Sequence, residues 1–193
     1  MDKLSKFKQI ILKGQAIPND LEQLFQFQVS RSLKKDRELD PLATIGIKMI
    51  EPDDKPVLLY HSYLNENDYS NLDIMANIDA INDVFELIIF VAEGEDQQIY
   101  GYWQPDREPI SIAPIVKFDN EGQFQLLRGM NLTEAILGDL AMGEAQRYLD
   151  FRNRFAWKID LNPSLENLNS PTSKINPYEL QAKIYQRNLK ALL

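Results

Sequence analysis

The sequence predicts an α+β domain in which helices pack on a mixed, mostly antiparallel sheet of about five or six strands, with a C-terminal helical extension. Three observations lead to this prediction. Apolar residues recur at helical spacing toward both ends of the chain, and β-patterned runs separated by turn residues crowd its middle. The 193 residues are also 44% hydrophobic, which is enough for one buried core and requires no second domain.

Two helices are predicted at the N-terminal end. Residues 3–13 carry apolar side chains at helical spacing, and Gly14 can close that helix. Residues 19–35 form a second helical pattern, for which Asn19 or Asp20 is the candidate N-cap.

The middle of the chain predicts the sheet. A helix is expected over 70–85, and residues 119–122 (DNEG) predict a hairpin turn, because short polar runs ending in glycine are common between paired strands. A helix over 131–142 follows, with Asn131 as its cap and Glu134 in the capping-box position. The predicted strands are residues 44–50, 57–63, 87–92, 99–103, 115–118 and 124–127.

The C-terminal part is predicted to be helical with a polar connection. Residues 144–158 continue as a helix, and residues 160–176 are rich in Asn, Ser and Pro and are typical of a linker. A last helix is expected from Asn176, which is followed by proline at the first helical position. We therefore divide the chain into an α+β domain, residues 1–143, and a helical extension, residues 144–193.

Charge is distributed unevenly along the chain. Residues 51–143 carry a net charge of −14, whereas residues 1–50 and 144–193 each carry +3, which gives the total of −8. An acidic field repels nucleic-acid phosphates and attracts basic partners. Two interpretations remain open at this point: a surface for a basic partner, or solubility combined with intramolecular pairing to the basic ends.

No residue pattern points to catalysis. The chain has no cysteine, and its one histidine, His61, lies in a predicted strand without a G-x-S-x-G nucleophile elbow elsewhere. Neither nucleotide-binding glycine fingerprint is present. Most acids fall in predicted turns, where carboxylates are usually solvated. We therefore expect no catalytic residues and no cofactor.

Metal and nucleic-acid sites are also not expected. Counted from Asp119, a calcium loop would need glycine at the sixth position and glutamate at the twelfth, but glycine is fourth and the twelfth residue, Met130, is not glutamate. Tyr100, Tyr102 and Trp103 lie in the most acidic region, where a nucleic-acid platform would need basic residues. Alternation places Tyr100 and Tyr102 on one sheet face and Trp103 with Gly101 on the other, and core packing accounts for them.

Residues 88–141 resemble the second half of the SUKH superfamily, the immunity-protein fold also found in a fungal cell-wall regulator. The similarity rests on the aromatic strand IYGYW at 99–103, on PIVKFDNEG at 114–122, and on the helix NLTEAILGDL at 131–140. It covers under a third of the chain. The asparagine–glycine turn that often follows an early helix in that family has no counterpart after residues 19–35.

The resemblance implies a non-enzymatic protein-binding module that neutralises a cognate bacterial toxin, as an immunity-type protein does, or that holds another protein. The absence of cysteine is compatible with a reducing cytoplasm, which is the expected location. Because many toxins of such systems act on nucleic acids and are basic, the expected partner is a protein such as a basic toxin domain, with no nucleic acid and no membrane involved. Self-association through the C-terminal helix and an uncharacterised hydrolase are the alternatives. The candidate partner-binding residues are acids in connections beside strands: Asp53, Asp54, Glu93, Glu95, Asp96, Asp106 and Glu108.

Overall fold

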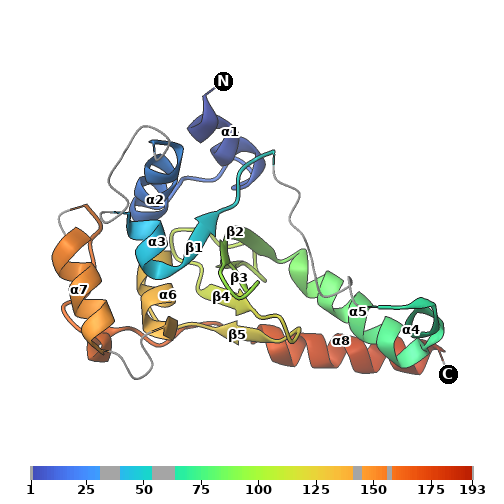
Figure 1. The fold of residues 1–193 in the computed structure, drawn as a ribbon. Helices are drawn as coiled ribbons and strands as arrows, with labels where there is room; N and C mark the ends of the chain where they lie inside the picture. The colour runs from blue at the N-terminus through green and yellow to red at the C-terminus, as the bar shows by residue number, and fades with distance from the viewer. Residues whose placement is uncertain (1, 31–39, 54–63, 141–144, 156–157, 193) are drawn as a thin grey trace.

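In the computed structural model, a five-stranded sheet lies between two layers of helices (Figure 1). The structure describes residues 2–30, 40–53, 64–140, 145–155 and 158–192. The strands lie side by side in chain order, and every neighbouring pair is antiparallel. The predicted α+β class is confirmed. The strands are β1 (Ile47–Met49), β2 (Ile88–Gly94), β3 (Ile99–Trp103), β4 (Ile115–Phe118) and β5 (Phe124–Leu126).

The longer helices fall close to the predicted ranges, but the sequence analysis predicts neither of the short helices α3 and α4. A 3₁₀ turn at Leu165–Asn167 lies within the stretch expected to be a linker. The described helices are α1 (Lys3–Ile10), α2 (Asn19–Ser30), α3 (Pro41–Ile45), α4 (Glu66–Ser70), α5 (Leu72–Phe85), α6 (Leu132–Leu140), α7 (Ala145–Phe155) and α8 (Pro177–Leu192).

The predicted strand at 44–50 is partly wrong, because its first two residues belong to α3. The Asp40 side chain caps that helix by accepting hydrogen bonds from the backbone N–H groups of Leu42 and Ala43. Gly46, at a φ of 66°, ends it in the left-handed conformation that favours glycine. The strand predicted at 57–63 lies outside the described residues.

The sheet buries both faces, and β3 shows the predicted alternation. Tyr100 and Tyr102 pack into the core beneath α1, α2, α3, α6 and α7, whereas Trp103 packs into the core on the opposite face. A β-bulge between Phe90 and Ala92 leaves Val91 as an extra residue in β2. The first core therefore receives Val91 and Ala92 together.

Gly101 marks the closest approach between β3 and β2. A Cβ atom at this position would lie 2.6 Å from the Ile88 Cγ2 atom and 2.7 Å from the Ile89 carbonyl oxygen. Both distances are shorter than van der Waals contact allows. Glycine is therefore required for this pairing, since any side chain would push the two strands apart.

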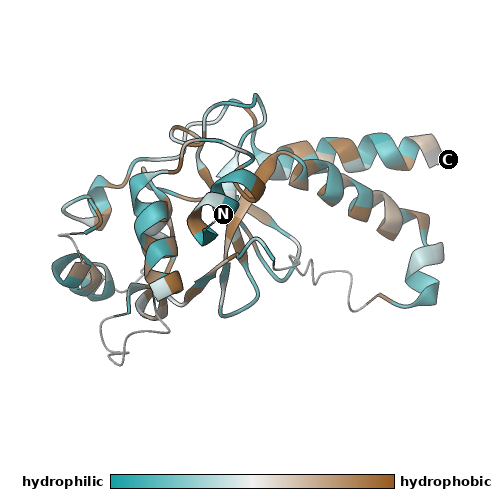
Figure 2. Ribbon diagram, turned by 90° about the horizontal axis from the view of Figure 1, so that it is seen from above, coloured by the Kyte–Doolittle hydropathy of each residue, from teal (hydrophilic) through white to brown (hydrophobic). Residues whose placement is uncertain are grey.

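Helices α5 and α8 form an arm that covers the second face of the sheet and extends beyond it (Figure 1). Leu180 and Ile184 of α8 pack against the second core, and Gln181 donates a 3.0 Å hydrogen bond to Asn77 of α5. Figure 2 shows hydrophobic residues along both helices where they lie next to each other. The C-terminal helix thus packs on the α5 helix of its own chain.

The connection that leads to α8 is held against the domain. The Trp103 indole N–H donates a 2.8 Å hydrogen bond to the carbonyl oxygen of Ile175. The Arg128 guanidinium donates to the Leu168 carbonyl at 2.9 Å, and Leu168 itself is buried in the first core. Residues predicted to be a polar linker therefore contribute packing and hydrogen bonds on both sides of the sheet.

Candidate protein-binding surface

The strand register separates the predicted acids into two groups at opposite ends of the sheet. Gly94 pairs with Ile47, and Ile99 pairs with Phe118, so the β2–β3 and β4–β5 turns share one end. Glu93, Glu95 and Asp96 belong to that end. Asp53, Asp106 and Glu108 follow strands that run to the other end. Asp54 and His61 lie outside the described residues.

Asp53 lies beside the basic N-terminal helix. The Lys6 ammonium is 3.8 Å from the Asp53 carboxylate, and Lys3 and Glu51 form a 2.9 Å pair nearby. At this end the structure matches the interpretation that acids pair with the basic termini. The Glu108 carboxylate, in the loop after β3, accepts a 3.2 Å hydrogen bond from the backbone N–H of Asp106.

The acids of the β2–β3 turn differ in their surroundings. Glu93 stands opposite Lys48 in the pairing of β2 with β1, which places unlike charges across from each other. The Glu95 side chain runs along Gly46 at the end of α3. Glu95 and Asp96 are both exposed, and neither has an ion pair among the described residues.

The β4–β5 turn is the predicted hairpin, which the structure confirms. The Asp119 carboxylate accepts hydrogen bonds from the backbone N–H groups of Glu121 at 3.0 Å and Gln123 at 2.9 Å. Gly122, at a φ of 80°, takes the conformation that a larger residue would adopt only with strain. Asp119 therefore shapes the turn, while Glu121 is exposed at its tip.

A cavity of about 540 Å³ lies between this turn and the arm. Isoleucines of α5 form its apolar wall, and carboxylates from three separate segments surround it. The Tyr185 hydroxyl donates a hydrogen bond to Asp73, and this bond raises the pKa of Tyr185. The residues that line the cavity are Leu64, Asp68, Asp73, Ile74, Asn77, Ile78, Ile81, Glu121, Gly122 and Tyr185.

Together these residues form what we call the acidic end: Glu95, Asp96 and Glu121 at the turns, with Asp68 and Asp73 at the cavity. Because β3 and β4 are neighbours, the two turns are roughly 10 Å apart, about one Debye length at 0.1 M salt. The electrostatic fields of the carboxylates at the two turns therefore reinforce each other. Sequence reasoning missed Asp68, Asp73 and Glu121 as members, since only the fold brings α5 beside the β4–β5 turn.

Buried acids occur elsewhere, around the start of α6. Burial raises the pKa of Asp20, although its carboxylate accepts hydrogen bonds from Thr133. The Glu134 carboxylate accepts from the backbone N–H groups of Met130 and Asn162. The predicted cap at Asn131 is confirmed, because its side chain accepts from the Glu134 N–H at 2.9 Å. The Glu134 side chain does not complete the capping box, since it accepts from the N–H of Met130 in place of that of Asn131. Asp20 joins α2 to α6, and Glu134 joins α6 to the segment that follows α7. Neither acid lines the cavities of about 1050, 540 and 680 Å³.

In the part of the chain that the structure describes, no three Asp or Glu side chains are grouped so that they could hold a metal ion. None of its helices has both the length and the apolar composition needed to cross a membrane.

Comparison with protein-family models, curated proteins and solved structures finds no match to this chain. The resemblance to the SUKH superfamily therefore stays a prediction.

Proposed function

We propose that this protein is a non-enzymatic protein-binding module that holds a basic protein partner at its acidic end. The observation that carries the proposal is the contrast between the two ends of the sheet. At the acidic end Glu95, Asp96 and Glu121 are all exposed and have no ion pair among the described residues. At the other end this holds for Asp106, but Asp53 and Glu51 have lysines of α1 beside them. Exposed carboxylates without a cationic neighbour produce a negative potential outside the protein, which speeds the approach of a cationic partner.

The cavity at the acidic end suits the side chains that such a partner would present. Lysine and arginine combine an aliphatic stem with a charged head, and both parts need a matching environment. Ile74, Ile78 and Ile81 offer an apolar wall for the stem, while Asp73 and Glu121 offer acceptors for the head. One basic side chain anchored there would add specificity to the general attraction.

The SUKH resemblance favours a bacterial toxin as the partner, which makes the protein an immunity-type inhibitor. Toxins that act on nucleic acids present basic surfaces, and an acidic inhibitor can cover such a surface. Self-association through α8 has less support, because Leu180 and Ile184 already pack on the same chain. The hydrolase alternative depends on His61, which lies outside the described residues.

Capture of partners from the source cell with matched variants tests the proposal. The first variant reverses three charges at the acidic end, Glu95→Lys, Asp96→Lys and Glu121→Lys. The control makes the same charge change at the other end of the sheet, Asp53→Lys, Asp106→Lys and Glu108→Lys. We expect a protein that is retained by wild type and by the control but lost from the first variant. Equal loss from both variants would reduce the effect to net charge and contradict the proposal.

A further inference from the structure

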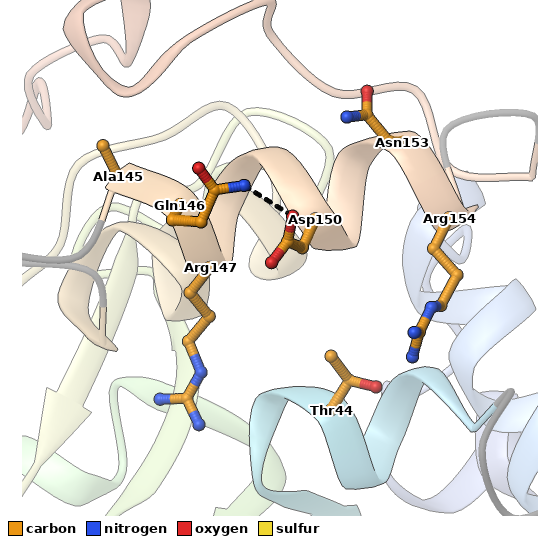
Figure 3. Close-up of a pocket in the computed structure, with 7 residues that line it drawn as sticks. All are labelled: Thr44, Ala145, Gln146, Arg147, Asp150, Asn153 and Arg154. Carbon is orange, nitrogen blue, oxygen red and sulfur yellow. Dashed lines mark hydrogen bonds between the residues drawn. The ribbon is translucent and has the colours of Figure 1, made fainter.

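A second cavity, of about 1050 Å³, lies between α3 and α7 (Figure 3). Helix α7 is on the side of the molecule away from the arm (Figure 1). Figure 3 shows the Arg147 and Arg154 side chains extending from α7 toward α3, with Thr44 of α3 facing them. In contrast to the acidic end, this cleft presents two guanidinium groups. Its lining residues are Thr44, Ala145, Gln146, Arg147, Asp150, Asn153 and Arg154.

The two arginines are held at a fixed spacing, because the opposite face of α7 is anchored. Tyr148, Phe151 and Phe155 are buried in the first core, and the Tyr148 hydroxyl donates a 3.1 Å hydrogen bond to the Asn162 carbonyl. Arg147 and Arg154 are seven residues apart on this helix, which corresponds to two turns and roughly 10 Å along its axis. Their side chains therefore leave α7 on the same side.

Asp150 lies between the two arginines on α7, so the charges along the cleft run positive, negative, positive. The Gln146 side-chain amide donates a 2.7 Å hydrogen bond to the Asp150 carboxylate and holds it in place (Figure 3). Arg154 can keep its other contacts and still bind a ligand, because a guanidinium carries five N–H donors.

From this arrangement we propose that the α3–α7 cleft binds an acidic peptide segment of another protein. The segment would place two carboxylates at positions i and i+4 of an extended chain, on one face and roughly 13 Å apart, within reach of two arginines whose side chains leave α7 roughly 10 Å apart. Each carboxylate would accept paired hydrogen bonds from one guanidinium fork. The residue at i+2, which lies between them on the same face, would be neutral or basic, opposite Asp150.

A compact anion such as phosphate fits this cleft less well. Phosphate sites gather several donors around one point, whereas Arg147 and Arg154 lie two helical turns apart. The Asp150 carboxylate also repels an anion placed midway between them. An extended ligand whose charges alternate avoids that repulsion and uses both arginines.

Fluorescence anisotropy with a labelled peptide of sequence Glu-Gly-Lys-Gly-Glu, whose charged side chains share one face when extended, tests the proposal on the full chain. We expect saturable binding, and we expect Arg147→Glu to raise Kd at least about tenfold, because it replaces a charge-assisted contact by repulsion. Arg147→Lys keeps the charge but loses the fork, so its Kd should lie between the two. Lys190→Glu on α8 is the matched control and should bind as wild type does.

Three outcomes would overturn the inference. The first is that wild type does not bind the peptide, and the second is that Arg147→Glu binds it as tightly as Lys190→Glu does. The third is that inorganic phosphate displaces the peptide at a concentration similar to the Kd of the peptide. The last outcome would assign the cleft to compact anions. A peptide in which glutamine replaces each glutamate checks that the carboxylates are required, and circular dichroism checks that each variant is folded.

Discussion

Asp20 on α2 and Thr133 on α6 are 113 residues apart in sequence and joined by two hydrogen bonds. One Asp20 carboxylate oxygen accepts from the backbone N–H and from the hydroxyl of Thr133, both at 3.1 Å. The sequence suggests Asp20 as a cap of its own helix. The structure directs its side chain instead to the start of α6, where the helix dipole favours negative charge. This contact fixes the position of α6 against α2 inside the first core.

The pH dependence of stability should report the burial of Asp20. Burial raises its pKa, so the folded protein holds this proton more tightly than the unfolded chain does. The penalty for burying the ionised form is therefore relieved as the pH falls from 7 toward the unfolded value near 3.8. We expect wild type to gain stability relative to Asp20→Asn over that range, as measured by urea unfolding. A relative loss would mean that the pKa is lowered instead.

Asp20→Ala removes both hydrogen bonds and should be more damaging than Asp20→Asn. It leaves the buried N–H and hydroxyl of Thr133 without an acceptor, at a cost of about 1–3 kcal/mol in the free energy of unfolding. The asparagine variant keeps an oxygen acceptor in the same place. Equal stabilities of the two variants at pH 7 would show that the contact with Thr133 is not made.

Gly101→Ala should destabilise the protein by about 3 kcal/mol, the upper end of the cost of overpacking, because the new methyl group meets Ile88 and Ile89. Gly122→Ala is the matched control. Its Cβ atom would have no neighbour closer than 3.9 Å, so only the left-handed backbone penalty of about 1–2 kcal/mol applies. Urea unfolding of both variants compares the two costs, and a larger loss for Gly122→Ala would be inconsistent with the strand pairing.

Lys117 on β4 and Asp139 on α6 form an ion pair of 2.8 Å, and their side chains are only 17% and 14% exposed. A double-mutant cycle with Lys117→Met and Asp139→Asn should give a coupling energy of about 1–3 kcal/mol, because each single change leaves a poorly solvated charge without its partner. A value below about 0.5 kcal/mol, as is usual for exposed pairs, would contradict the observed burial.

Packing of α8 on its own chain can be tested at two neighbouring positions of that helix. Leu180→Ala removes a side chain that contacts the second core and should cost about 1–3 kcal/mol of stability. Lys183→Ala changes an exposed residue and should shift stability by less than about 0.5 kcal/mol. Unfolding at two protein concentrations adds a check, since a midpoint that depends on concentration would indicate that α8 packs on another copy.

Local signals predicted much of the fold. The strand ranges 99–103 and 115–118 agree with the structure, because alternation and turn residues bound them clearly. Thr44 and Ile45 belong to a run rich in β-branched residues, which favours a strand. The caps at Asp40 and Gly46 were the signals that could have identified the short helix.

The candidate surface could be predicted only in part. Glu95 and Asp96 are recognisable from sequence as turn acids near a strand end. Their grouping with Glu121 and Asp73 depends on strand order and on the arm, which no local pattern encodes. Sequence reasoning also treated Asp53 as equivalent to Glu95, whereas the structure separates them by the length of the sheet and places Lys6 beside Asp53.

The association rate constant of the captured partner, measured by stopped flow against ionic strength, tests the central claim most directly. If the acidic end steers a basic protein, the wild-type rate should fall steeply as salt rises. The triple variant Glu95→Lys, Asp96→Lys and Glu121→Lys should lower the association rate constant at least about tenfold at low salt. The matched charge reversal at Asp53, Asp106 and Glu108 should lower it less. A rate constant that changes neither with salt nor with these substitutions would contradict the proposed function.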